Sequence, residues 1–205
     1  MSLEIIQHPL AIHGINRLRD RETTPQSFRR SCDQVTTYLA IAATRDLQMK
    51  EVSMETPMEQ MQARVVDEPI VVVAILRAGA GMIDSVVRLL PEVSVGYIGL
   101  ERNEETAEAR RYYCKFPPVR GNRVLVVDPM LATGGSAEQA IEAVYEAGAS
   151  SVDFLCIVAA PEGVQLLESR FPDLRIFAGA LDRELDENKY IRPGLGDFGD
   201  RLYGT

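Results

Sequence analysis

Apolar residues recur at helical spacing in the first third of the chain, and this pattern changes near residue 70. Between residues 28 and 47, one helical face is formed by Phe28, Cys32, Val35, Leu39 and Ala42. Residues 49–62 are rich in glutamate and methionine, the methionines being Met49, Met54, Met58 and Met61. We expect these flexible side chains to fill gaps in packing rather than to bind a cofactor. The pattern predicts an N-terminal helical extension over residues 1–68.

From residue 70 onward, strand-like and helix-like segments alternate. The segment IVVVAIL at residues 70–76 is a continuous apolar run, which is typical of a strand buried on both faces of a parallel sheet. Further strands are predicted at residues 93–100, 124–127, 152–158 and 174–180. Helices are predicted at residues 82–90, from Ser136 to a stop at Gly148, and from Pro161 to Phe171. Repeated βα units predict a doubly wound, mainly parallel α/β sheet flanked by helices.

The composition limits the compartment and the partners. The chain has 205 residues, with 22 Lys and Arg against 30 Asp and Glu, for a net charge of −8. This acidic balance argues against a nucleic-acid binder, which needs a cationic face. No apolar run approaches the ~18 residues of a membrane helix, and the first residues lack the basic-then-apolar pattern of a signal peptide. We therefore expect a single cytoplasmic domain over residues 1–205, with no membrane and no nucleic-acid partner.

Cysteine and histidine are too few and too scattered for several common sites. Cys32, Cys114 and Cys156 form no CxxC pair and no even-numbered disulfide framework. The two histidines, His8 and His13, both lie near the N-terminus. A zinc cluster and a Ser-His-Asp hydrolase are therefore disfavoured.

The segment VLVVDPMLATGGS at residues 124–136 joins a buried strand to a glycine-rich loop and a helix start. Ligands of open α/β sheets bind at the carboxyl ends of strands, so Asp128 is predicted to face a site. Residues 133–136 (TGGS) offer consecutive backbone N–H groups and two hydroxyls at a helix N-terminus, which suits an anion. The alternative is that Ser136 is an ordinary N-cap after a turn. The strand-terminal Asp128 favours the anion cradle.

A series of longer motifs resembles the uracil phosphoribosyltransferase family over essentially the whole chain. In order they are HPL at 8–10, ILRAGAGM at 75–82, RNEET at 102–106, DPMLATGGS at 128–136, AAPEG at 159–163 and YIRPGLGDFGDRLYGT at 190–205. The resemblance implies a phosphoribosyltransferase-like core with a hood from the chain ends, its base-binding part lying near residues 181–205. It also implies a pentosyltransferase of pyrimidine salvage, which converts uracil and 5-phosphoribosyl-1-diphosphate (PRPP) to UMP and diphosphate.

The resemblance further implies which residues bind PRPP. Asp128 would accept hydrogen bonds from the ribose hydroxyls, while Arg77 and Arg102 would meet the diphosphate through planar, multidentate donors. These three residues are the expected catalytic residues. The full PRPP set is Arg77, Arg102, Asp128, Pro129, Met130, Leu131, Ala132, Thr133, Gly134, Gly135, Ser136 and Asp197. For Arg102 a solvated charge is the alternative, because glutamates surround it.

The C-terminal motif resembles the hood that binds uracil. The expected contacts are Met130, Tyr190, Ile191, Gly196, Asp197 and Phe198, with backbone groups reading the base. A mobile loop at residues 193–199 is the alternative. Phe198 stands where many relatives have alanine, so the ring is expected to reshape the pocket rim, and Ala109 stands where proline is common.

The resemblance also bears on the cofactor, the assembly and competing functions. Mg²⁺ would be bound mainly through PRPP, with no direct protein ligand and Asp197 reached through water. A homodimer or homotetramer is expected. Two alternative functions remain, a regulatory protein that senses PRPP or UMP on the same fold, and a phosphoribosyltransferase for another nucleobase. The net charge of −8 argues against an RNA-binding regulator.

Overall fold

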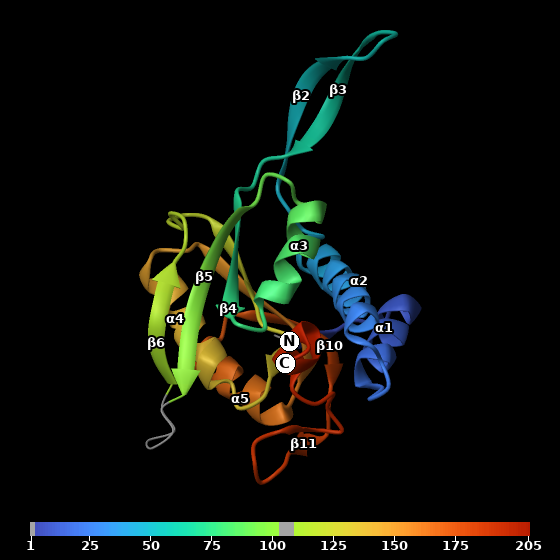
Figure 1. Cartoon of the computed structure of the whole chain (residues 1–205). Helices are drawn as coiled ribbons and strands as arrows, with labels where there is room; N and C mark the ends of the chain where they lie inside the picture. The colour runs from blue at the N-terminus through green and yellow to red at the C-terminus, as the bar shows by residue number, and fades with distance from the viewer. Residues whose placement is uncertain (1–2, 103–108) are drawn as a thin grey trace.

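A mostly parallel sheet forms the centre of the computed structural model, which describes residues 3–102 and 109–205 (Figure 1). Its order is β1-β10-β9-β7-β4-β5-β6, and β8 also pairs with β9. The parallel strands are β1 (Leu3–Ile5), β10 (Arg175–Leu181), β9 (Ser151–Ala159), β7 (Arg123–Val127), β4 (Ile70–Leu76), β5 (Ser94–Arg102) and β8 (Met130–Leu131). β6 (Ala109–Lys115) runs antiparallel to β5 at one edge. The predicted doubly wound α/β fold class is confirmed.

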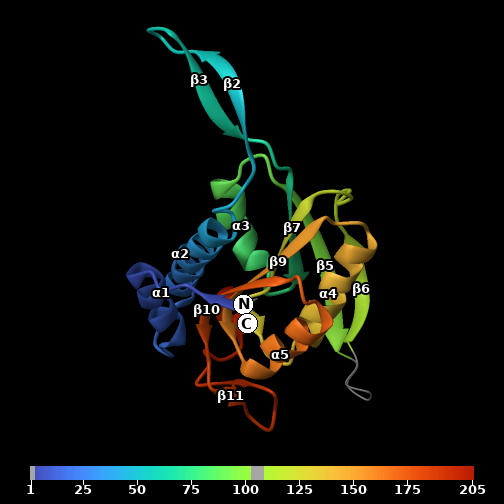
Figure 2. The same ribbon diagram turned by 180° about the vertical axis from the view of Figure 1, so that it is seen from behind.

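Helices cover both faces of this sheet (Figures 1 and 2). One face carries α1 (Pro9–Arg19), α2 (Pro25–Ala43), α3 (Ala80–Leu89) and α6 (Phe198–Tyr203), and the other carries α4 (Gly135–Glu146) and α5 (Pro161–Arg170). A hydrophobic core lies on each face of the sheet, and β4 contributes side chains to both. Val72 and Ala74 belong to the first core, whereas Val71 and Val73 belong to the second, because successive side chains alternate across a strand.

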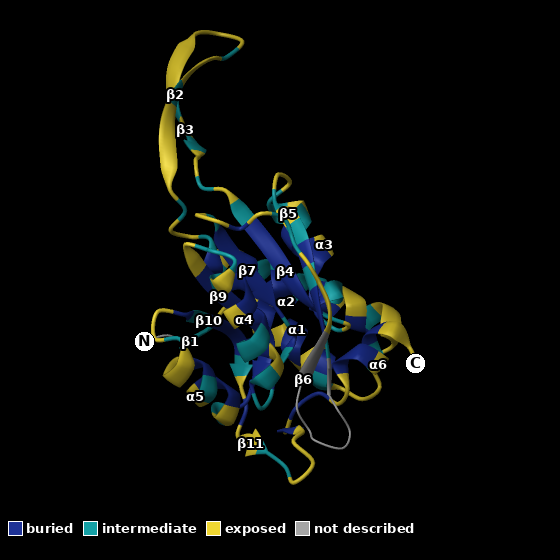
Figure 3. Cartoon of the chain, turned by 90° about the vertical axis from the view of Figure 1, so that its left-hand side faces the viewer, coloured by how far each residue is buried: buried dark blue, intermediate teal, exposed yellow. Residues whose placement is uncertain are grey.

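Residues 49–66 form a long β-hairpin, so the expected helical extension is wrong for this segment. β2 (Met49–Glu55) and β3 (Gln60–Val66) pair antiparallel and project away from the sheet (Figures 1 and 2). The methionines do not fill gaps in the core, since Met58 is 90% exposed and the others are exposed as well. Alternation of Met61, Ala63 and Val65 with polar residues is the strand signal that the helical interpretation missed. Figure 3 shows the hairpin almost entirely exposed.

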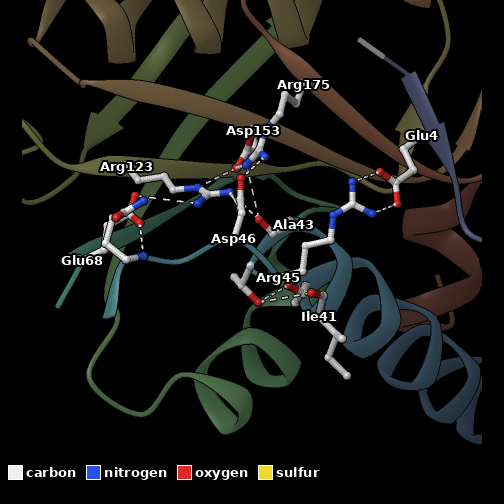
Figure 4. Close-up of polar contacts among 12 residues, drawn as sticks. Glu4, Ile41, Ala43, Arg45, Asp46, Glu68, Arg123, Asp153 and Arg175 are labelled. Atoms are coloured by element: carbon white, nitrogen blue, oxygen red, sulfur yellow. Dashed lines mark hydrogen bonds and ion pairs between the residues drawn. The ribbon is translucent and has the colours of Figure 1, made fainter. Parts of the chain in front are cut away.

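A cluster of charges around the buried Arg123 and Asp153 lies at the amino ends of β7, β9 and β10 (Figure 4). Arg123 Nε donates to Asp153 Oδ2 at 2.8 Å, and Arg175 Nε donates to Asp153 Oδ1 at 2.7 Å. Both arginines also bind the Asp46 carboxylate, at 2.9 and 2.6 Å. Burial raises the pKa of Asp153 to about 6, and the guanidinium of Arg123 opposes that rise. Because Asp46 precedes the hairpin and Glu68 follows it, 3.7 Å from Arg123, the cluster fixes the root of the hairpin to the sheet.

Replacing Arg123 with alanine is expected to lower the free energy of unfolding by about 3–5 kcal/mol, because Asp153 keeps a buried charge with one partner fewer. Urea unfolding measures this loss. Arg45→Ala is the matched control, since Arg45 makes a bidentate pair with Glu4 at the surface, where such pairs contribute below about 1 kcal/mol. Equal small losses in both variants would contradict the assignment of a structural role to the cluster.

Candidate active site

A cavity of about 310 Å³ opens where β7 ends and α4 begins. Its lining residues are Asp128, Met130, Leu131, Ala132, Thr133, Gly134, Gly135, Ser136, Ala137, Asn188, Lys189 and Tyr190. Parallel strands place their carboxyl ends at one edge of the sheet, which is where the ligands of such sheets bind. The structure therefore brings Asp128 and the glycine-rich loop together, as the sequence predicts, and adds Tyr190 from the C-terminal segment.

The start of α4 has no side-chain cap. Gly134 is the N-cap residue, in the left-handed region with φ +87°, so Ser136 lies inside the first turn and is not the cap. The first N–H groups of an α-helix have no partner within the helix, and together with the helix dipole they attract an anion. Gly134 is required here, because a Cβ would lie 2.9 Å from Leu166 Cδ2 in addition to the unfavourable φ. The local geometry is that of an anion cradle.

Asp128 is the carboxylate beside this cradle. Burial raises the pKa of Asp128 to about 7, and a hydrogen bond from the Met130 backbone N–H to Asp128 Oδ1, 3.4 Å long, lowers it in part. A carboxyl group with this pKa changes its charge near neutral pH. A ligand that donates hydroxyl hydrogen bonds to Asp128 will favour the ionised form.

Pro129 lies between Asp128 and the cradle, and it does not line the cavity. Pro129 is buried, and its carbonyl accepts hydrogen bonds from the N–H groups of Ile157 and Val158, both at 3.0 Å. Its role is to hold the loop against β9.

Arg77 follows β4 directly and lies on a neighbouring part of the same edge, outside the cavity lining. Its side chain is 69% exposed, with Nη2 4.0 Å from Asp200 Oδ1, and its carbonyl accepts a hydrogen bond from Tyr203. The Leu76–Arg77 peptide is cis. The turn after Arg77 packs tightly, because a Cβ on Gly79 would lie 2.5 Å from the carbonyl oxygen of Val127. The loop that carries Arg77 therefore contacts the residue just before Asp128.

Arg102 ends β5, the strand next to β4. The rest of the RNEET motif, residues 103–106, lies outside the described residues, as does the position of the Arg102 side chain. The predicted role of Arg102 stays a prediction.

The C-terminal segment forms a small hood at the carboxyl edge of the sheet. β11 (Glu184–Leu185) pairs antiparallel with β12 (Ile191–Arg192), and the turn between them carries Asn188, Lys189 and Tyr190 into the cavity lining. Tyr190 is 54% exposed. Of the predicted uracil contacts, Met130 and Tyr190 line the cavity.

The other predicted base contacts do not line it. Ile191 and Phe198 are buried, and the Phe198 ring packs against Phe28 with ring centroids 5.0 Å apart. The expectation that the Phe198 ring reshapes the pocket rim is therefore wrong, because the ring belongs to the core. Gly196 and Asp197 are exposed, and Asp197 Oδ1 accepts a hydrogen bond from the Asp200 N–H at 2.9 Å as the N-cap of α6.

Paired charges anchor the hood to α1. Arg19 binds both carboxylate oxygens of Asp182, at 2.8 and 2.6 Å, and donates to the Gly194 carbonyl at 2.8 Å. The Gly194 N–H completes the ring by donating to Asp182 Oδ2 at 2.8 Å. Arg201 donates to the Leu195 carbonyl at 2.7 Å and lies over the Phe28 ring. These contacts tie Gly194 to α1 and Leu195 to α6.

Sequence reasoning missed Asn188 and Lys189 as cavity residues. The family motif begins only at Tyr190, and the preceding residues show neither a strand nor a helix pattern. β11 and β12 are two residues long each, so the turn between them is recognised only from their pairing in the structure.

This sheet, with a strand-terminal aspartate beside an uncapped glycine-rich helix start, has the phosphoribosyltransferase fold. A solved hypoxanthine-guanine phosphoribosyltransferase from Bacillus anthracis shares the fold with a TM-score of 0.54 at 17% identity, covering 77% of this chain and 80% of that one. Residues 5–205 match the sequence profile of the uracil phosphoribosyltransferase family. The chain belongs to that family.

Full-length relatives support the assignment. The uracil phosphoribosyltransferase of Listeria innocua is 45% identical over 206 residues, covering 100% of this chain and 99% of the relative. The uracil phosphoribosyltransferase of Geobacillus kaustophilus is 46% identical over 203 residues, covering 98% of this chain and 97% of the relative. A solved structure of a protein from Aquifex aeolicus is 35% identical with a TM-score of 0.95, covering 99% of this chain and 98% of that one. Among the described residues, no helix is long and apolar enough to cross a bilayer.

Proposed function

We propose that this protein transfers the phosphoribosyl group of PRPP to N1 of uracil, giving UMP and diphosphate in pyrimidine salvage. The observation that carries the proposal is the single cavity shared by Asp128, the uncapped start of α4 and Tyr190 of the hood. It combines a hydroxyl acceptor, an anion cradle and an aromatic surface, which are the groups that a phosphorylated ribose and a planar base require.

In the proposed reaction the bond from the ribose anomeric carbon to diphosphate breaks as the bond to uracil N1 forms. The electron pair leaves with the diphosphate, so positive charge develops on the ribose and negative charge on the leaving group. The proton on uracil N1 is lost as the new bond forms, and the departing diphosphate accepts it. Residues 132–136 hold the 5′-phosphate, and ionised Asp128 accepts hydrogen bonds from the ribose hydroxyls. Arg77 and Arg102 stabilise the leaving diphosphate. Catalysis is then mainly positioning and charge stabilisation.

The donor set at this edge fits a magnesium ion that is held by substrate oxygens. Among the described residues, no group of three or more His, Cys, Asp or Glu is arranged to hold a metal. Mg²⁺ usually keeps several waters and binds phosphate oxygens, so a protein cage is not required. Asp197 is exposed and uses Oδ1 as a helix cap, which leaves Oδ2 for a hydrated ion. When bound with PRPP, the ion supplies charge neutralisation on the diphosphate.

Uracil recognition is assigned to the backbone of Ile191 and residues 196–198, with Met130 and Tyr190 packing against the base. The burial of the Ile191 and Phe198 side chains supports this division, because only their backbone groups remain for a ligand. The hood is also part of the core through Leu195 and Leu202. Deleting residues 190–205 would therefore disrupt the fold, and single substitutions are the appropriate tests of this segment.

Diphosphate release from PRPP tests the proposed reaction. In the presence of Mg²⁺ the purified protein is expected to release diphosphate only when uracil is added. Release without uracil, or none with it, would contradict the proposal. The readout does not depend on which product nucleotide is detected.

We also propose a homodimer or homotetramer in the cytoplasm. The projecting hairpin supports an oligomer, because Met49, Met54, Met58 and Met61 are exposed on it and apolar surface of this kind favours association. Light scattering at micromolar concentration is expected to give at least twice the mass of one chain, and a monomer would contradict the proposal. The three free cysteines are consistent with a reducing compartment.

A further inference from the structure

Lys189 has an unusual backbone conformation for a lysine. Its φ is +67°, and it is the only residue other than glycine with a positive φ in the part of the chain that the structure describes. L-residues avoid this region because the Cβ is crowded, and such conformations persist where the surroundings enforce them, often at functional sites. Lys189 lines the cavity beside the start of α4.

The surroundings do enforce the conformation. Asp186 Oδ1 accepts hydrogen bonds from the N–H groups of Asn188, at 2.9 Å, and Tyr190, at 3.0 Å. The Lys189 N–H donates to the Asp186 carbonyl at 2.9 Å. Asp186 Oδ2 in turn binds Arg192 Nε at 2.8 Å, which ties the turn to β12. A built turn therefore holds Lys189 at the cavity.

Lys189 is also the source of positive charge in the cavity lining. Of the residues that line the cavity, Asp128 carries the carboxyl group and Lys189 the amino group. A phosphate bound at the α4 cradle carries up to two negative charges, whereas a helix N-terminus supplies roughly half a positive charge. Lys189 is the one basic side chain among the described lining residues.

The charge of Lys189 acts on the carboxylate of Glu162. That carboxylate is held first by the N–H of Leu185, at 3.0 Å, and the charge of Lys189 contributes less to lowering its pKa. Lys189 is exposed, and among the described residues no ion pair joins it to a carboxylate.

We propose that Lys189 binds the 5′-phosphate that the α4 cradle holds, so that the hood contributes a charged contact to the phosphorylated ribose. The inference rests on the proposed function and assigns to the hood a second role besides base recognition. Lys189 is then expected to affect the affinity for PRPP and UMP, which carry the 5′-phosphate, and to leave the affinity for uracil unchanged.

Lys189→Gly is the sharpest variant, because glycine adopts a positive φ readily and keeps the turn while removing the charge. Loss of one charge-assisted hydrogen bond is expected to raise the Kd for UMP and the KM for PRPP about 10-fold or more. The KM for uracil at saturating PRPP is expected to stay within about twofold. Lys189→Arg, which restores the charge, is expected to recover part of the affinity.

Lys50→Ala is the matched control. Lys50 lies on β2 of the hairpin, pairs with Asp67 and does not line the cavity, so the substitution removes an equal charge outside the proposed site. Titration of each variant with UMP by calorimetry gives the Kd without turnover, and thermal melts show that each variant is folded. Lys189→Asn serves as a second neutral variant, since Asn also tolerates this conformation.

A Kd for UMP within twofold of the parent in Lys189→Gly and Lys189→Asn would overturn the proposal. An unchanged Kd with a raised KM for uracil would overturn it as well, because Lys189 would then shape the base site. If the parent forms no UMP from uracil, the proposed function fails on its own, and titration with PRPP and Mg²⁺ still tests whether Lys189 binds a phosphoribosyl group.

Discussion

Replacing Asp128 with asparagine is expected to abolish most phosphoribosyl transfer while the protein stays folded. The carboxylate lies beside the anion cradle and is placed to accept hydrogen bonds from both ribose hydroxyls. An amide accepts such bonds through one oxygen and without charge, so a loss of about a hundredfold or more in kcat/KM for PRPP is expected. Steady-state kinetics with PRPP varied at saturating uracil measures it. Turnover near that of the parent with intact PRPP affinity would remove Asp128 from the site.

The pH dependence of kcat/KM for PRPP, measured in the parent and in Asp128→Asn, is a second test of the role of Asp128. Because burial raises the pKa of Asp128 to about 7, the ligand-free parent carries the acceptor carboxylate mainly above that pH. Its kcat/KM for PRPP is expected to rise through pH 7 and then level off, and Asp128→Asn is expected to lack this step. An identical step in both proteins would assign the titration to another group.

In the parent, the contribution of Asp128 to stability changes with pH in the opposite direction to its contribution to activity. The raised pKa of Asp128 means that the folded state holds this proton more tightly than the unfolded state. Its contribution to stability is therefore largest at low pH and is lost as the pH rises towards 7. Asp128→Asn is expected to melt no lower than the parent at pH 8, which separates a functional loss from misfolding.

Replacing Arg77 with alanine is expected to depress catalysis far more than stability. Its side chain is mostly exposed beyond the end of β4, so its removal leaves no buried group unpaired. Loss of one preorganised donor to a developing oxyanion costs roughly 3–4 kcal/mol, or about 10²–10³ in rate. Arg77→Lys is expected to recover only part of the rate, because a point charge cannot make two parallel hydrogen bonds.

Arg88→Ala is the matched control for Arg77, since Arg88 is similarly exposed and also lies near an aspartate, 3.2 Å from Asp33. It is expected to show parental kinetics. If Arg77→Ala unfolds the protein, or keeps kcat and the KM for PRPP within about twofold of the parent, Arg77 is structural and another group holds the diphosphate.

The fold could be predicted from the sequence where burial dictates the pattern. Residues 70–76 read as a strand buried on both faces, and β4 has the same bounds, because both faces of the sheet are covered by helices. The hairpin at residues 49–66 could not be recognised in this way. Both of its faces are largely exposed, so hydrophobic periodicity carries little information about it.

The site could be predicted where a local motif builds it. Asp128 and residues 133–136 form one continuous strand–loop–helix unit, so their proximity follows from the sequence. Lys189 reaches the same cavity only through the pairing of β11 with β12 and the anchoring of Asp182 by Arg19. The contact between Arg19 and Asp182 joins residues 163 positions apart, and no local pattern records it. Phe198 belongs to a local motif, but its position in that motif did not reveal that its ring packs in the core against Phe28.

A panel of nucleobases tests directly whether the protein transfers the phosphoribosyl group to uracil. The purified protein is incubated with PRPP, Mg²⁺ and one of uracil, orotate, hypoxanthine or guanine, and the nucleotide product is identified by chromatography. We expect UMP from uracil and no comparable product from the other bases. Preferential formation of another nucleotide, or PRPP binding without any transfer to uracil, would contradict it.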